Sequence, residues 1–373
     1  MTTIVNKNYM NKNIKNKVFK IKDTVLKKYI SNIFQKCALS KKHSVIVSHG
    51  LVNADLRGVW SHGVVRTSVY CNRILKKAAQ AKPQIKFKKI YKNIFHVNGD
   101  NGLGFVTSYL TMKKCVQAAK KYGVSVAGIY NSNHFGMAAN YLEQATKNNC
   151  VSWIFTNASK ALPPHGAMQA HFGTSPFSFG CPTDNKKKPF ILDMATSSVA
   201  RGKLKFAAQR GEKIPFGLAL DKFGKATDDG FKAFEGIMLP FGGMKGAGLS
   251  WMMDIVAGIF TGAAHSGAVK NAINDFSGAA NVGHFIICLK ADLFQNKLNF
   301  LKKMKFGIQA AKQLKLAKGF KEILYPGEPE YKKFIDNKKN GISLTLDVVK
   351  DLNALGALFK IKSPLMPSSK FSR

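Results

Sequence analysis

Three side chains within six positions, Ser61, His62 and Arg66, can together handle a proton and a small anion. An imidazole with a pKa of about 6.5 gives and takes a proton at neutral pH. A guanidinium four residues further on can hold a carboxylate through two parallel N–H groups. We therefore expect an active site at the run 61–66. A helix-capping serine followed by a surface histidine and a surface arginine is an equally simple structural interpretation.

Arginine is scarce in this chain, which makes its positions informative. Of the 58 basic residues only six are arginine, so lysine is used wherever a positive charge suffices. The few arginines are candidates for sites that need a planar fork of donors. Arg57 and Arg66 flank the histidine run, and Arg201 opens a later charged segment. We expect Arg66 and Arg201 to bind substrate.

A second histidine, His134, follows a predicted strand over residues 125–130 and precedes a predicted helix over residues 137–148. Ligands gather at such strand ends, because the unpaired N–H groups of the next helix point there. The polar loop 131–136 is therefore the second candidate site, and His134 is a second candidate acid or base.

Two further segments allow two interpretations each. Asp193, in a predicted strand over residues 190–196, can accept hydrogen bonds from ribose hydroxyls or can cap the following helix. The glycine-dense stretch 242–248, which includes Lys245, can approach a phosphate closely or can allow close helix packing.

The remaining pattern predicts an ordinary order of helices and strands. Pro83 ends the third helix, and a turn-rich loop over residues 98–104 leads into a long helix. Predicted helices cover two segments within 24–56, then 65–77, 105–122 and 295–315, with two short ones at the C-terminal end; predicted strands cover 85–90, 94–97, 151–156 and 286–289.

The composition is globular but strongly basic, with a formal net charge of +38 over 373 residues. The lysines are spread along the chain without a nucleic-acid-binding motif, so we expect a lysine-biased surface and no specific nucleic-acid partner. Six widely spaced cysteines indicate reduced thiols in a cytoplasm, with no disulfide framework and no metal site. The apolar stretch 246–269 contains Asp254, His265 and several glycines, which predicts a buried core helix and no membrane span.

Several common catalytic signatures are absent. No G-x-G-x-x-G follows a strand, and there is no phosphate-binding P-loop, serine-hydrolase elbow or H-E-x-x-H zinc motif. Two loop histidines, a nearby arginine and glycine-rich loops suit polar chemistry at a carbonyl. One histidine would protonate the oxygen while the arginine holds a neighbouring carboxylate.

Seven motifs occur in the order found in one known family. They are Ser61-His62-Gly63-x-x-Arg66, Asp100-Asn101-Gly102-Leu103-Gly104, Asn131-Ser132-Asn133-His134-Phe135-Gly136, Gly173-Thr174-Ser175-Pro176, Leu192-Asp193-Met194-Ala195-Thr196, Leu239-Pro240-Phe241-Gly242-Gly243-x-Lys245-Gly246 and Tyr325-Pro326-Gly327-Glu328. Over roughly residues 24–360 the chain resembles the malate/L-lactate dehydrogenase family that lacks a Rossmann fold. That family also contains ureidoglycolate and sulfolactate dehydrogenases, diketogulonate reductases and cyclic-imine reductases.

The resemblance implies a homodimeric oxidoreductase that transfers a hydride between NAD or NADP and a small 2-hydroxy or 2-oxo acid. It implies an α/β fold of the mixed α+β kind, in which a non-Rossmann mixed sheet binds the nucleotide. A mostly helical domain would come from both chain ends. We expect a flexible basic extension over 1–20, a helical domain over 21–80 plus 290–373, and a sheet domain over 81–289.

The resemblance also assigns roles position by position. Ser61 and His62 resemble the acid/base pair, Arg66 the carboxylate clamp and Thr174 a substrate contact, while His134 stays an alternative proton carrier. The positions that resemble the cofactor-binding set are His134, Phe135, Gly136, Met137, Ala138, Asp193, Met194, Ala195, Lys245, Pro326, Gly327 and Glu328.

Departures from the family pattern leave the substrate open. Leu218 stands where many relatives carry tryptophan, and the loop 163–172 adds His165 and His171. A malate-like or lactate-like acid is the leading expectation, with a cyclic imine carboxylate or ureidoglycolate as alternatives. A basic binding protein without catalytic activity is a weaker one.

Overall fold

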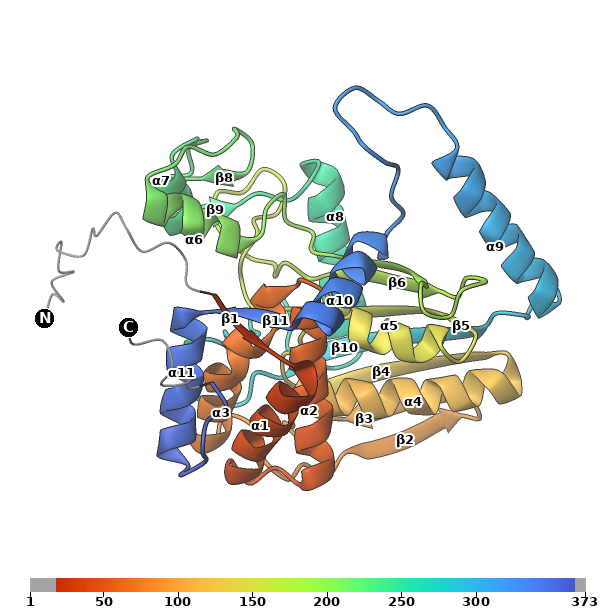
Figure 1. The fold of residues 1–373 in the computed structure, drawn as a ribbon, viewed down its shortest axis with the longest axis horizontal. Coiled ribbons are helices and arrows are strands. Elements are labelled where there is room, and N and C mark those ends of the chain that lie inside the picture. The colour runs from red at the N-terminus through yellow and green to blue at the C-terminus, as the bar shows by residue number, and fades with distance from the viewer. Residues whose placement is uncertain (1–17, 366–373) are drawn as a thin grey trace, which may run out of the picture.

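The computed structural model describes residues 18–365, and its centre is a mixed sheet of seven strands (Figure 1). Only β3 and β4 run parallel, and every other pair of neighbours is antiparallel. In spatial order the strands are β2 (Lys86–Tyr91), β3 (Ile94–Asn98), β4 (Val124–Ser132), β10 (Val282–Lys290), β5 (Cys150–Thr156), β6 (Phe177–Cys181) and β7 (Phe190–Met194). This order confirms a mixed α/β fold without the doubly wound parallel sheet of a Rossmann domain.

Helices cover both faces of this sheet because successive strand residues point to opposite sides. On one face, Ala127, Ile154 and Ile286 pack beneath α4 (Gly104–Tyr122) and α5 (Ala139–Thr146). On the other face, Phe155 and Phe285 pack with Met253 and Ala257. A sheet buried on both faces gives a rigid platform for the loops at its edge.

The segment predicted as a buried core helix is only half buried, so that expectation was wrong. It forms α8 (Met244–Met253) and a π-helical continuation (Asp254–Ile259), and the residues after 259 leave the helix. Small residues such as Gly246 and Ala257 face the core, whereas Trp251 and Ile259 are about half exposed. A side chain on Gly246 would overlap backbone atoms of Phe241, so close packing accounts for this glycine.

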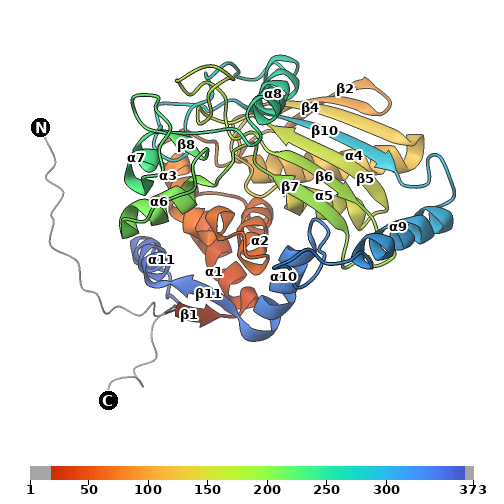
Figure 2. The same ribbon diagram turned by 90° about the horizontal axis from the view of Figure 1, so that it is seen from above.

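The helical region is assembled from both ends of the chain (Figures 1 and 2). Its buried side chains come from residues 21–106 and 342–365 and form one continuous cluster. Its elements are β1 (Val18–Ile21), α1 (Asp23–Lys36), α2 (Lys41–Leu56), α3 (Thr67–Leu75), α10 (Glu328–Asn340), β11 (Ile342–Thr345) and α11 (Leu346–Leu358).

The basic extension expected over 1–20 falls mostly on residues outside the described range. Residues 18–20, however, belong to β1, which pairs antiparallel with β11. Phe19 packs against the helical core. These three residues are therefore an ordered strand, and the expectation was wrong for them.

Two parts of the chain stand apart from the sheet. A small lobe has its own buried cluster, which includes Leu204 and Met238. It contains α6 (Arg201–Arg210), β8 (Ala219–Leu220), α7 (Gly230–Glu235) and β9 (Ile237–Met238). Helix α9 (Lys297–Lys312) has no buried side chain and projects from the body, as Figure 1 shows.

Candidate active site

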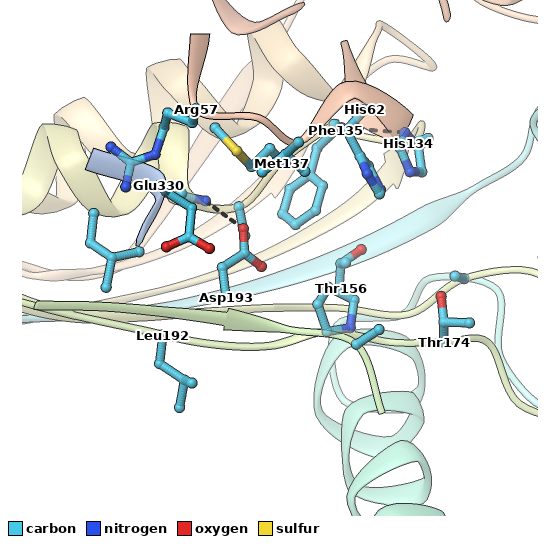
Figure 3. Close-up of a pocket in the computed structure, with 18 of the residues that line it drawn as sticks. Arg57, His62, His134, Phe135, Met137, Thr156, Thr174, Leu192, Asp193 and Glu330 are labelled. Atoms are coloured by element: carbon cyan, nitrogen blue, oxygen red, sulfur yellow. Dashed lines mark hydrogen bonds between the residues drawn. The ribbon is translucent and has the colours of Figure 1, made fainter. Parts of the chain in front are cut away.

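A cavity of about 520 Å³ lies where the sheet, the helical region and the start of α10 meet. Its lining comes from five main stretches of chain, within 57–62, 134–139, 156–159, 191–195 and 324–330. Figure 3 shows His62, His134 and Thr174 toward one end and Arg57, Leu192 and Glu330 toward the other. The cavity therefore has a histidine end and a far end.

The run 61–66 forms a compact turn of two short 3-10 helices, Trp60–His62 and Val64–Arg66. The buried carboxyl group of Asp55 lies under it and accepts a hydrogen bond from the backbone N–H of Val64 at 2.8 Å. A side chain on Gly63 would overlap that carboxyl group, so only glycine fits between the two helices. Arg66 Nε donates to the carbonyl oxygen of Ser61 at 2.9 Å. These contacts fix the spacing of His62 and Arg66.

His62 lies at the cavity wall with its ring stacked on that of His134, the centroids 5.7 Å apart and the planes 20° from parallel. Its Nδ1 lies 3.0 Å from the hydroxyl oxygen of Ser61. Burial, and then the positive charge of Arg66, lower the pKa of His62 to about 4. His62 is therefore neutral at physiological pH.

His134 is held in one tautomer by its neighbours. Its Nδ1 accepts a hydrogen bond from the backbone N–H of Gly136 at 3.2 Å and lies 2.7 Å from the hydroxyl of Tyr70. An Nδ1 that accepts an N–H carries a lone pair, so the ring proton is on Nε2. Burial, followed by the electrostatic effects of His62 and Arg66, lowers the pKa of His134 well below its ordinary value. His134 is a fixed neutral donor through Nε2.

Asp193 has both carboxylate oxygens occupied by protein donors. Oδ2 accepts from the backbone N–H of Ala139 at 2.9 Å, at the start of α5, and Oδ1 lies 3.1 Å from the hydroxyl of Ser178. Burial raises the pKa of Asp193. Asp193 does not cap the following helix, α6, whose N-cap residue is Ala200. Its carboxylate instead accepts from the first N–H of the earlier helix α5.

The residues along the cavity fit a dinucleotide, whose site must hold two flat rings and a diphosphate. Phe135 and Met137 form an apolar wall, and Phe135 is backed by the parallel ring of His284 at 4.8 Å. Gly327, with φ +93°, lies against the backbone of Ile191, a close approach that a side chain would crowd. It leads into α10, whose first turn carries the acids Glu328 and Glu330; the Glu328 N–H donates to the Tyr325 carbonyl and Pro329 has no N–H.

Most of the residues predicted for the site come together in this cavity. Those that line it are His62, His134, Phe135, Gly136, Met137, Ala138, Thr174, Asp193, Ala195, Pro326 and Gly327. Ser61 and Arg66 lie directly behind His62, in contact with each other.

Besides Ser61 and Arg66, four predicted residues do not line the cavity. Arg201 lies in the small lobe, donates to the carbonyl oxygen of Phe234 at 3.2 Å and contacts the ring of Phe234. Lys245 is exposed at the start of α8, and Met194 lies outside the lining. Glu328 is buried and accepts a hydrogen bond from Lys312 at 2.7 Å.

Sequence reasoning missed several lining residues. Arg57 was singled out for its residue type but not placed in the cofactor region, where its guanidinium bonds Glu143 at 2.6 Å. Asn157 follows strand β5 and Lys270 precedes strand β10, and neither residue belongs to a recognisable motif. Glu330 stands two residues after Glu328, and its position in the first turn of α10 was the only available signal.

The comparisons with known proteins agree with this geometry. The family model described as malate/L-lactate dehydrogenase matches residues 21–353. The chain belongs to this family. The malate/(S)-sulfolactate dehydrogenase of Methanothermus fervidus is 33% identical over 326 residues, which cover 87% of this chain and 94% of that protein.

Two other relatives support the same family membership. The solved sulfolactate dehydrogenase from Methanocaldococcus jannaschii has a TM-score of 0.87 at 33% identity and covers 92% of this chain and 98% of that one. The ureidoglycolate dehydrogenase (NAD(+)) of Escherichia coli K12 is 28% identical, covering 88% of this chain and 93% of that protein. The chain is thus a dehydrogenase of the hydroxy-acid class, as the resemblance predicted.

Residues 18–365 contain neither a candidate membrane helix nor a candidate metal site. No helix in that range has both the length and the apolar character needed to cross a membrane. The same range contains no group of three or more His, Cys, Asp or Glu side chains placed to hold a metal ion.

Proposed function

We propose that this dehydrogenase transfers a hydride reversibly between a nicotinamide cofactor and C2 of a small 2-hydroxy acid of the malate or lactate kind. The observation that carries the proposal is the pair of neutral histidines stacked at one end of a dinucleotide-sized cavity, with the Arg66 turn behind them. The cofactor, when bound, supplies the hydride donor and acceptor. The protein supplies the proton, the orientation and the exclusion of water.

His62 is the proton carrier in this proposal. When the hydroxy acid is oxidised, a base must take the hydroxyl proton, and the neutral ring of His62 can do so. His134 cannot do so as it stands, because its Nδ1 already accepts the Gly136 N–H and its Nε2 holds a proton. The Ser61 hydroxyl beside His62 Nδ1 can stabilise either protonation state, since a hydroxyl donates and accepts.

Arg66 holds the carboxylate of the substrate. The Nε–H bond to Ser61 fixes the side chain by one edge, and no protein partner is recorded for the terminal nitrogens within residues 18–365. The charge of Arg66 is one cause of the lowered pKa of both His62 and His134. The two terminal N–H groups can therefore bind one carboxylate bidentately beside His62. Thr174, which lines the same end, would contact the substrate.

The chain acts as a homodimer in this proposal. Side chains of Met244, Trp251, Ile255, Ile259 and Phe260 are 47–73% exposed along α8 and its continuation. A contiguous exposed apolar strip of this kind marks an interface, and a closed twofold pair is the commonest way to cover one. Light scattering on the purified chain should give twice the chain mass, and Ile259→Asp should shift it toward the monomer.

The cytoplasm is the compartment that fits the thiols. All six cysteines are free and buried, and a compartment that keeps thiols reduced preserves that state.

The test of the proposed activity is a panel of 2-oxo acids incubated with the purified protein and each reduced cofactor. We expect consumption of a reduced cofactor with oxaloacetate, pyruvate or sulfopyruvate, and formation of the matching 2-hydroxy acid. A cyclic imine carboxylate in the panel distinguishes the alternative reaction. If no 2-oxo acid is reduced with either cofactor, the proposed function is wrong.

A further inference from the structure

The far end of the cavity contains an acidic side chain, Glu330, that has no hydrogen-bond or ion-pair partner among the described residues. Two acidic residues line the cavity, Asp193 and Glu330. Asp193 has both oxygens engaged, by Ala139 and Ser178. For Glu330 no hydrogen bond or ion pair is recorded within residues 18–365, and Figure 3 shows its carboxylate directed into the cavity beside Asp193.

Other residues already supply the structural roles that an acid at position 330 could have. Glu330 lies in the first turn of α10, where a negative charge stabilises the helix. Glu328, in the same turn, supplies that charge and pairs with Lys312. The cation lining the same end, Arg57, is neutralised by Glu143 at 2.6 Å. Among the described residues, Glu330 is thus a half-buried carboxylate without a partner, in a chain whose net charge is +38.

The direction of the bound cofactor follows from the proposed function, on which this inference rests. The nicotinamide must lie at the histidine end, next to the proton carrier His62. An extended dinucleotide then places its adenosine half toward Arg57 and Glu330 at the far end.

We propose that Glu330 binds the two neighbouring hydroxyls of the adenosine ribose and thereby makes this dehydrogenase prefer NAD to NADP. A carboxylate accepts hydrogen bonds from both hydroxyls of an unmodified ribose. The 2′-phosphate of NADP removes one of those donors and brings two negative charges toward the carboxylates of Glu330 and Asp193. The other acid, Asp193, already accepts hydrogen bonds from Ala139 and Ser178, whereas neither oxygen of Glu330 has a donor within residues 18–365.

The test is the equilibrium binding of NADH and of NADPH, measured by nicotinamide fluorescence on the full chain without substrate. We expect the wild type to bind NADH at least about tenfold more tightly than NADPH, the difference that a charged hydrogen bond supplies. Glu330→Gln keeps the shape of the side chain and removes its charge. It should weaken NADH binding, leave NADPH binding equal or tighter, and reduce the preference to about threefold or less.

A matched control is Asp347→Asn, which removes a first-turn acid from α11, outside the cavity lining. It should keep the wild-type preference, and thermal unfolding of both variants should show that each is folded. Equal binding of the two cofactors by the wild type, or a Glu330→Gln variant that weakens both equally, would overturn the inference while leaving the proposed function intact. Failure of the wild type to bind either cofactor would overturn both.

Discussion

The two ends of the cavity differ in their electrostatics. At the histidine end, His62 and His134 are both kept neutral by burial and by the charge of Arg66. At the far end, Arg57 is paired with Glu143, and Glu330 has no partner within residues 18–365. The histidine end therefore suits a proton transfer to a substrate held by a cation. The far end suits recognition of an uncharged polar group.

The two ends also differ in how they are held. The catalytic turn is fixed by buried contacts within a few residues, from Asp55 to Val64 and from Arg66 to Ser61. The far end combines segments remote in sequence, with the backbone N–H of Ile191 bonded to the carbonyl of Pro326 at 3.0 Å. Changes at the first end should therefore affect the reaction, and changes at the second should affect cofactor binding.

The largest expected effect is that of His62→Asn, which removes the proton carrier. We expect kcat to fall by about a hundredfold to ten-thousandfold, the usual contribution of a general acid or base. The affinity for reduced cofactor should change little. Steady-state kinetics together with fluorescence titration would check this, with the exposed His265→Asn as control. A fully active His62→Asn would transfer the role to His134.

The next effect is that of Arg66→Lys, which keeps the charge but loses the planar fork. The KM for the acid should rise by about tenfold to a hundredfold, because one of two parallel hydrogen bonds is lost. Arg201→Lys is the matched control, since Arg201 lies in the small lobe, donates to the Phe234 carbonyl and should leave KM unchanged. An increase in KM for Arg201→Lys alone would instead place the substrate carboxylate near the small lobe.

A smaller effect, on stability rather than chemistry, is expected from Asp193→Ala. Removing this carboxylate leaves the Ala139 N–H and the Ser178 hydroxyl without their partner. The free energy of unfolding should fall by about 1–3 kcal/mol, as for other buried hydrogen-bonded groups. Urea denaturation would measure it. Unchanged stability with lost cofactor binding would show that Asp193 contacts the cofactor directly.

The smallest effect is the pH dependence contributed by Asp55. Burial raises its pKa from 3.8 to about 7, so the folded state holds the proton more tightly than the unfolded state. The resulting stability is complete below the unfolded pKa and is lost as pH rises toward 7. The free energy of unfolding of Asp55→Asn, taken relative to that of the wild type, should therefore rise by about 1 kcal/mol or more between about pH 5 and about pH 8. A gap that stays constant with pH would contradict the raised pKa.

The sequence predicted the histidine end better than the far end, for a physical reason. Ser61, His62 and Arg66 lie in one short turn, so their spacing along the chain already reflects their spacing in space. Glu330 lies beside Asp193 because the loop before α10 packs against β7, where the Ile191 N–H bonds the Pro326 carbonyl, and no local pattern encodes that contact. The same limit applied to Lys245, which is exposed; of the glycines around it, only Gly246 is required by close packing.

The fold followed local patterns closely where the periodicity was strong. The helices α1, α2 and α4 and the strands β2, β3 and β5 lie within a few residues of their predicted bounds. Strand β6 was missed, because it has only five residues and directly follows a loop rich in proline and glycine, to which it was assigned. The half-exposed face of α8 was missed because exposure depends on which surfaces neighbouring elements cover.

The most direct test of the central claim, hydride transfer at the histidine end, is the fate of deuterium from NADH labelled at C4 of the nicotinamide. The purified dehydrogenase would be incubated with each labelled epimer and oxaloacetate, and the product analysed by NMR. The account predicts that one of the two epimers delivers deuterium to C2 of malate in the wild type, and that His62→Asn suppresses this transfer while still binding NADH. Deuterium absent from C2 with both epimers, or transfer at the wild-type rate in His62→Asn, would contradict it.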